Sequence, residues 1–192
     1  MFQINFKRLW KTIIANKNNI DSKDKFQINF KKLWKTVIAN KNRIDSDIHG
    51  PHHWARVERN GLYLCKLNGA DETIVRLFAV FHDSMRENDG RDMEHGLRAA
   101  KYAQSLLGKE YQLTADKFDL LYYACQYHTK RRLTKDITIG TCWDADRLDI
   151  GRVCMTPSAY YMNSPEAKQI VVNSEWKALY KAEKLVTLKH LL

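Results

Sequence analysis

The sequence lacks the features that mark membrane-spanning and secreted proteins. No stretch approaches the roughly 18 apolar residues that a membrane-spanning helix needs, and the N-terminal segment MFQINFKRLW has no apolar run of secretory length. We therefore expect no transmembrane segment and no signal peptide. The cytoplasm is the expected location.

Cysteine is scarce and scattered. Cys65, Cys125, Cys142 and Cys154 show no CxxC spacing, which argues against a four-cysteine zinc site. A chain of 192 residues is long enough to close a substantial core without covalent cross-links. The cysteines are therefore interpreted as free thiols in a reducing compartment.

Positive charge is concentrated in one part of the chain. The net charge is +10, but residues 1–46 carry eleven Lys and Arg against three Asp, which leaves only +2 for the remaining 146 residues. Lysines on the solvated face of a helix explain this pattern, with a phosphate-binding surface as the alternative. Nucleic acid is not the partner we expect.

The basic segment is a duplication. Residues 2–22, FQINFKRLWKTIIANKNNIDS, recur at 26–46 with 18 of 21 positions identical. Apolar residues in each copy fall at helical spacing, so each copy predicts an amphipathic helix. We expect helix 26–43 to pack on a helical domain spanning 26–192. The extra copy, residues 1–25, then has a spare apolar face, which favours a hairpin or a homodimer contact, with a membrane-surface or targeting helix as the alternative.

The rest of the chain has the helix-start and capping residues of a helical protein. Pro51 suits the start of a helix over 51–67, Asp71 can cap a helix to about 86, and Asp92 can cap 93–107. Further helices are expected over 114–129, from Ser164 and after Ser174. The ITI at 137–139 is the only β-branched cluster of note, so the predicted class is all-α.

Two adjacent polar groups end the most apolar of these helices. Positions 74, 75, 77, 78, 80 and 81 are all apolar, which implies near-complete burial and places His82 and Asp83 deep in the protein. A buried carboxylate costs several kcal/mol unless it is paired or coordinated. His53, His95 and His128 lie on other predicted helices, and Asp146 follows in DADRLD. A divalent cation at their meeting point would remove the cost of burying these groups.

The order of these residues resembles that of the HD-domain superfamily, metal-dependent hydrolases with an all-α helical bundle. The resemblance lies in His53 within HWARV, in the His82-Asp83 doublet and in Asp146 within ADRLD. It extends over roughly residues 47–155, with 29 residues from His53 to His82 and 63 from Asp83 to Asp146.

The resemblance implies a ligand set and a reaction. His53, His82, Asp83 and Asp146 would hold one divalent metal ion, and His95 and His128 would hold a second ion or a phosphate, with hydrogen-bonded core histidines as the alternative. The donors do not distinguish among Mn, Fe, Mg, Co, Ni and Zn. The implied activity is phosphohydrolase: metal-activated water would cleave a phosphate ester or anhydride of a nucleotide or similar small phosphorylated substrate.

One position departs from the pattern of the nucleotidase and alarmone-hydrolase branches. Their catalytic glutamate lies three residues after the HD aspartate, where this chain has Arg86. Beside Asp83, the catalytic candidates are Glu87 and Asp89 as general acid or base. Arg86, Lys130 and Arg131 are candidates for binding substrate phosphates, although a solvated loop also explains the last two.

The remaining polar residues near the motifs have structural interpretations. Asp144 and Asp149 flank Asp146, and one of them is expected to cap a helix or to support a metal ligand. His49 and His52 are interpreted as loop or first-turn residues.

Two other functions stay open. Some proteins of this fold hold two irons with a similar residue order and oxygenate small molecules. A non-catalytic module that recruits nucleic acid or an acidic partner through the basic leader is the third possibility.

Overall fold

The computed structural model describes residues 28–40, 46 and 48–181, which form eight α-helices, two short 3-10 helices and no strand. The all-α prediction is confirmed. The α-helices are α2 (Phe30–Ala39), α3 (Pro51–Asn68), α4 (Glu72–Phe81), α5 (His95–Leu106), α6 (Ala115–Tyr127), α7 (Ile137–Leu148), α8 (Pro165–Val172) and α9 (Trp176–Lys181). The extra leader copy, and any dimer contact through it, lie outside the described residues.

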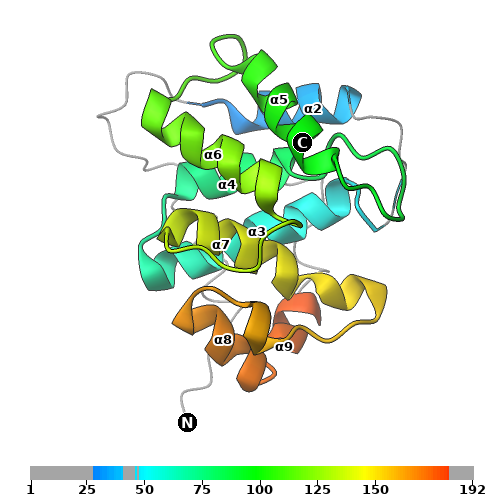
Figure 1. Ribbon diagram of the computed structural model, residues 1–192, viewed down its shortest axis with the longest axis vertical. Coiled ribbons are helices and arrows are strands. Elements are labelled where there is room, and N and C mark those ends of the chain that lie inside the picture. The colour runs from blue at the N-terminus through cyan, green and yellow to red at the C-terminus, as the bar shows by residue number, and fades with distance from the viewer. Residues whose placement is uncertain (1–27, 41–45, 47, 182–192) are drawn as a thin grey trace.

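Helix α4 lies at the centre of the bundle. It packs against α2, α3, α5, α6 and α7, and seven of its ten residues, from Ile74 to Phe81, are buried. Figure 1 shows α2 and α5 at one end of the molecule, α8 and α9 at the other, and α3, α4, α6 and α7 between them. The residues that follow α4 therefore emerge in the interior of the protein.

Helix α3 is buried on all sides, although many of its residues are polar. Residues 53–65 are all buried, and two of the polar ones have partners on neighbouring helices. Arg76 Nε donates to Glu58 Oε1 at 2.7 Å, and Asn60 Nδ2 donates to the Ala145 carbonyl at 3.2 Å. The close approach of α3 to α4 needs a glycine, because a Cβ on Gly61 would lie 2.3 Å from a methyl of Val75.

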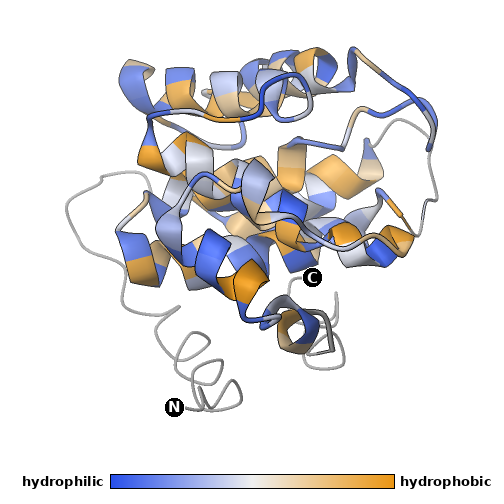
Figure 2. Ribbon diagram, turned by 60° about the horizontal axis from the view of Figure 1, so that its bottom comes forward, coloured by the Kyte–Doolittle hydropathy of each residue, from blue (hydrophilic) through white to orange (hydrophobic). Residues whose placement is uncertain are grey.

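The second leader copy forms α2, which packs on the body as the sequence predicts, over a shorter range. Leu33, Trp34 and Val37 are buried, and the Trp34 ring centroid lies 6.1 Å from that of Trp54 on α3. Figure 2 shows hydrophobic and hydrophilic residues interleaved along the helices, the pattern that amphipathic packing requires. Among the described residues, no helix combines the length and the apolar character needed to cross a membrane. All four cysteines are free.

Several predicted helix starts are confirmed. Pro51 opens α3, the Asp71 carboxylate accepts from the backbone of Thr73 and Ile74, and Ser164 Oγ accepts from Ala167 N. The start of α5 was predicted wrongly. Glu94, not Asp92, occupies its N-cap position. The Asp92 carboxylate instead accepts from Glu87 N at 2.9 Å.

The helix expected to reach residue 86 ends at Phe81. Ser84 explains the early end, because its backbone N–H and its hydroxyl both donate to the Phe81 carbonyl, at 2.9 and 2.7 Å. The β-branched cluster Ile137–Ile139 opens α7, in agreement with the all-α prediction. The Asp136 carboxylate caps that helix by accepting from Ile139 N at 2.9 Å, so capping and packing override β propensity.

Candidate metal centre

The His82-Asp83 doublet lies in the turn that follows α4, inside the bundle. His82 has no exposed surface and Asp83 only 5%. The sequence prediction that both are buried is confirmed. The His82 ring turns back along its own helix, so that Nδ1 lies 3.2 and 3.1 Å from the carbonyl oxygens of Phe78 and Ala79.

Four buried histidines meet near Asp83. His53 comes from α3, His95 from the start of α5, and His128 from the end of α6. Each ring has an oxygen acceptor at Nδ1. The acceptors are Asp149 Oδ2 for His53 (2.7 Å), the two α4 carbonyls for His82, and the carbonyl oxygens of Asp92 for His95 and of Cys125 for His128 (2.7 Å).

These acceptors fix the tautomers. A carbonyl or carboxylate oxygen only accepts, so Nδ1 of each ring carries the proton and Nε2 of the neutral ring carries a lone pair. The Nε2 atoms face one another in two pairs, His53 with His82 at 3.1 Å and His95 with His128 at 2.9 Å. Two facing lone pairs at this distance repel unless a proton or a cation lies between them.

The spacing of the nitrogens suits a metal ion. Neighbouring ligands on an octahedral ion with metal–nitrogen bonds of about 2.1 Å lie about 3.0 Å apart. Two groups of three residues, His53, His82 and Asp83 and then Asp83, His95 and His128, each bring one ligand atom per residue within 4.8 Å of the others. These buried groups could hold a metal ion.

Asp83 belongs to both groups. Its Oδ2 lies 3.6 Å from Nε2 of both His53 and His82, while its Oδ1 lies 3.2 Å from His95 Nε2 and 3.6 Å from His128 Nε2. Oδ1 is buried and receives no hydrogen bond. A buried carboxylate oxygen without a donor is costly, and a cation would satisfy it. The residues present therefore fit a metal.

Asp146, from α7, lies beside the first group, although it is not one of its three residues. Its Oδ1 lies 3.2 Å from His53 Nε2 and 3.9 Å from His82 Nε2. The Asp146 side chain is 18% exposed, whereas those of His53 and His82 are fully buried. Asp146 is therefore more exposed to solvent than either histidine.

The protonation states of His82 and Asp146 suit cation binding. Burial opposes the protonation of His53, but its hydrogen bonds with Asp146 and Asp149 raise its pKa, so an ion bound at Nε2 would displace a proton from this ring. Burial lowers the pKa of His82 to about 3, against the attraction of the nearby carboxylates, so this imidazole is neutral at physiological pH. Burial opposes the ionisation of Asp146, but its hydrogen bond with His53 and the positive charges of His82, His53 and Arg152 together outweigh that cost and lower its pKa. A neutral imidazole and an ionised carboxylate are the forms that bind metal.

Comparison with protein-family models, with curated proteins and with solved structures finds no match to this chain. The residues and their geometry are therefore what carries the functional proposal. The resemblance to the HD-domain superfamily stays a prediction.

The other predicted residues lie at different distances from the centre. Arg86 is buried, and its Nη1 lies 3.3 Å from both ring nitrogens of His95. Glu87 is exposed and lies 3.6 Å from Arg98. Lys130 and Arg131 are exposed, with Lys130 Nζ 2.8 Å from Glu94 Oε1. Glu87 is not among the groups that converge on Asp83.

Asp89 is tied to a histidine that sequence reasoning treated as a loop residue. Asp89 Oδ1 lies 2.8 Å from His49 Nδ1, and it also accepts from the Ser46 hydroxyl. The His49 ring centroid lies 6.4 Å from that of His53. Burial lowers the pKa of His49 more than Asp83 and Asp89 raise it. The signal in the sequence was the spacing of one helical turn between His49 and His53.

The two aspartates flanking Asp146 realise the two expected structural roles. Asp149 supports His53 through Nδ1 and also accepts from Arg56 Nε at 2.8 Å. Asp144 accepts from the backbone N–H and the side chains of Asn163 and Ser164, and so fixes the start of α8. His52 lies exposed in the first turn of α3, as expected.

Proposed function

We propose that this protein is a metal-dependent phosphohydrolase that cleaves a phosphate ester or anhydride of a nucleotide or similar small phosphate. The observation that supports the proposal most is the Asp83 carboxylate, buried between two pairs of imidazoles whose lone pairs face one another. His53, His82, Asp83 and Asp146 would hold the ion. When bound, a divalent ion supplies a water of lowered pKa and polarises a phosphoryl oxygen.

Residues of the chain orient the imidazole rings of the proposed ligands. Asp149 and the carbonyl oxygens at the end of α4 hold the rings of His53 and His82 with Nε2 turned to the centre. Supporting contacts of this kind fix the tautomer and raise the basicity of a ligand. Asp146 is the ligand nearest to solvent, so substrate would approach from its side.

His49 is the residue best placed to serve as general acid. Its Nδ1 is held by Asp89, so Nε2 of the protonated ring is the atom that can donate to the leaving-group oxygen. Because burial lowers the pKa of His49, this protonated form is the minority form at neutral pH. Asp89 then orients His49 rather than transferring the proton itself. This revises the earlier assignment of general acid–base chemistry to Glu87 or Asp89.

The second ligand group gives a specific reason to keep one alternative. Asp83, His95 and His128 form a second set of three possible ligands that shares a carboxylate with the first. If the residues of both groups held a pair of irons, the ions would supply the chemistry for oxygenation of a small organic substrate. Oxygen consumption that depends on iron would identify that chemistry.

The test is a screen for phosphate release from nucleotides and sugar phosphates, under nitrogen, with added Mn, Mg, Co, Ni, Fe or Zn. The variants His82→Ala and Asp83→Ala should lose both bound metal and activity. His52→Ala is the matched control, because it removes an exposed histidine from the helix that carries His53.

Two outcomes would contradict the proposal. Phosphate release that is unchanged in His82→Ala and Asp83→Ala would remove this site from the reaction. Oxygen uptake with no phosphate release from any substrate would favour the di-iron alternative.

A further inference from the structure

The two ligand groups differ in the charges around them. The first group has two further carboxylates, Asp146 at 3.2 Å from His53 Nε2 and Asp149 at 2.7 Å from His53 Nδ1. The second group shares Asp83 with the first and has an arginine beside it. Arg86 Nη1 lies 3.3 Å from the His95 ring nitrogens and 3.6 Å from Asp83 Oδ1.

Arg86 is held firmly in this position. Its side chain is only 8% exposed, Nε donates to the Asn88 carbonyl at 3.2 Å, and Nη2 donates to the Gly90 carbonyl at 2.8 Å. The guanidinium closes the 86–90 loop on itself. Moving it away from His95 would break both hydrogen bonds.

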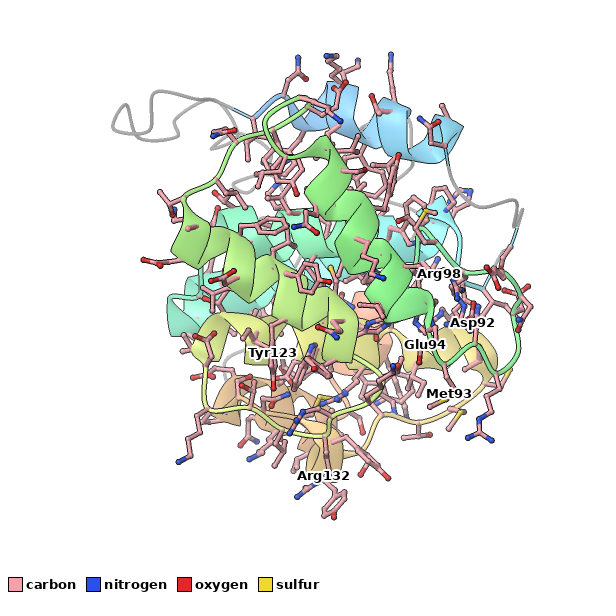
Figure 3. The ribbon with its side chains drawn as sticks, turned by 45° about the horizontal axis from the view of Figure 1, so that its top comes forward. Asp92, Met93, Glu94, Arg98, Tyr123 and Arg132 are labelled. Atoms are coloured by element: carbon pink, nitrogen blue, oxygen red, sulfur yellow. The ribbon has the colours of Figure 1, made fainter. Side chains whose placement is uncertain are left out.

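The residues on either side of Arg86 are also anchored. Arg98 Nε, on α5, donates to the Met85 carbonyl at 3.0 Å. The Glu87 backbone N–H donates to Asp92 Oδ2 at 2.9 Å, and Arg98 Nη2 donates to the same oxygen. Figure 3 shows Asp92 and Arg98 side by side at the start of α5. The loop thus presents the Arg86 charge as a fixed feature of the second group.

We propose that Arg86 restricts this centre to one tightly bound divalent ion, because its guanidinium takes the place of a second cation beside Asp83 Oδ1, His95 and His128. An ion held by His95 Nε2 and Asp83 Oδ1 would share both atoms with Arg86 Nη1, and like charges at this range repel strongly in a buried site. The carboxylates near His53 have the opposite effect on the first group. Arg86 is therefore a positioning residue that sets the metal stoichiometry.

This inference rests on the metal centre of the proposed function and makes the di-iron alternative unfavourable. It also gives Arg86, which stands where the nucleotidase and alarmone-hydrolase branches have a glutamate, a role that requires a positive charge. In place of a second ion, Arg86 Nη1 offers one fixed positive charge to the shared carboxylate and to any phosphate oxygen at the centre.

The experiment is a titration of the metal-stripped full chain with Mn²⁺, by calorimetry and by equilibrium dialysis with elemental analysis. The wild type should bind one ion tightly and a second about 100-fold or more weakly. Arg86→Gln should bring the second affinity to within about tenfold of the first. Arg86→Lys, which keeps the charge, should behave like the wild type.

Further variants locate the second ion and protect the test against misfolding. His95→Ala combined with Arg86→Gln should abolish the second ion and leave the first. Arg86→Met provides a second neutral substitution, and thermal melting followed by circular dichroism shows whether each variant is folded.

Three results would overturn the inference. They are two equally tight ions in the wild type, no gain of a second ion in folded Arg86→Gln or Arg86→Met, and an Arg86→Lys variant that behaves like Arg86→Gln. Absence of any bound ion in the wild type would have a different meaning, since it would reject the metal centre of the proposed function as well.

Discussion

Replacing Asp83 with Asn should destabilise the protein much more with metal than without it. In the metal-free protein, Asp83 is a buried charge whose Oδ1 receives no hydrogen bond. Leaving a buried polar group unsatisfied costs about 1–3 kcal/mol, and more for a charged group. Asp83→Asn removes this cost but also the attraction to Arg86, whose Nη1 lies 3.6 Å from Oδ1, so the metal-free variant should stay within about 1–3 kcal/mol of the metal-free wild type.

With metal the variant should be clearly less stable than the wild type. A ligand that binds only the folded state stabilises it by about 2.7 kcal/mol when its free concentration is 100 times its dissociation constant. The wild type should gain this stabilisation. Asp83→Asn should gain little, because it lacks the carboxylate that both ligand groups share.

The assay is thermal unfolding at pH 8 in excess chelator and again in excess Mn²⁺. For a chain of this size, 1 kcal/mol corresponds to about 2–4 °C in melting temperature. The control is His52→Ala, which should melt like the wild type in both conditions. Melting of Asp83→Asn below the wild type in chelator, by as much as in metal, would refute the reasoning, since Asp83 would then be satisfied without a cation.

Four further substitutions test separate parts of the account. Asp149→Asn should weaken metal binding about 10–100-fold without unfolding the protein, because it removes the acceptor that orients a ligand ring; unchanged affinity by calorimetry would contradict this. His49→Gln should slow hydrolysis of a phosphate ester with a poor alkoxide leaving group by about 10²–10⁴-fold and affect a p-nitrophenyl ester far less, since that leaving group needs no acid; equal losses would exclude the role. Burial opposes ionisation of Asp92, but the donors around it lower its pKa below 3.8. Asp92→Asn should therefore lower the free energy of unfolding in denaturant by about 1–3 kcal/mol above pH 3.8. The loss should disappear as the pH falls through the lowered pKa, and a loss independent of pH would contradict this role of Asp92. Gly96→Ala should destabilise the fold by about 1–3 kcal/mol, because a Cβ would lie 2.5 Å from the Cys125 carbonyl oxygen, and a variant more stable than the wild type would show that α5 and α6 can separate.

The burial of the HD doublet was predictable because it depends on a local pattern. A helix with apolar residues on almost every side has to be central, so the residues at its end lie in the interior. The meeting of His53, His82, Asp83 and Asp146 was predictable only through the order and spacing of a motif. No periodicity in the sequence brings α3, α4 and α7 together.

The parts that escaped prediction depend on contacts distant in sequence or on single side chains. His49 and Asp89 are 40 residues apart, and only the packed structure joins them. The end of α4 is decided by the hydroxyl of Ser84, which competes for a backbone carbonyl. The orientation of Arg86 toward His95 depends on carbonyl groups in an irregular loop, whose conformation no hydrophobic pattern encodes.

The most direct measurement of the central claim is anomalous X-ray scattering from crystals of the protein loaded with Mn²⁺. We expect an anomalous peak within bonding distance of Nε2 of both His53 and His82, with Asp83 Oδ2 and Asp146 Oδ1 as its oxygen ligands. Metal-loaded crystals with no peak there, and with the four side chains hydrogen-bonded only to one another or to water, would contradict the account.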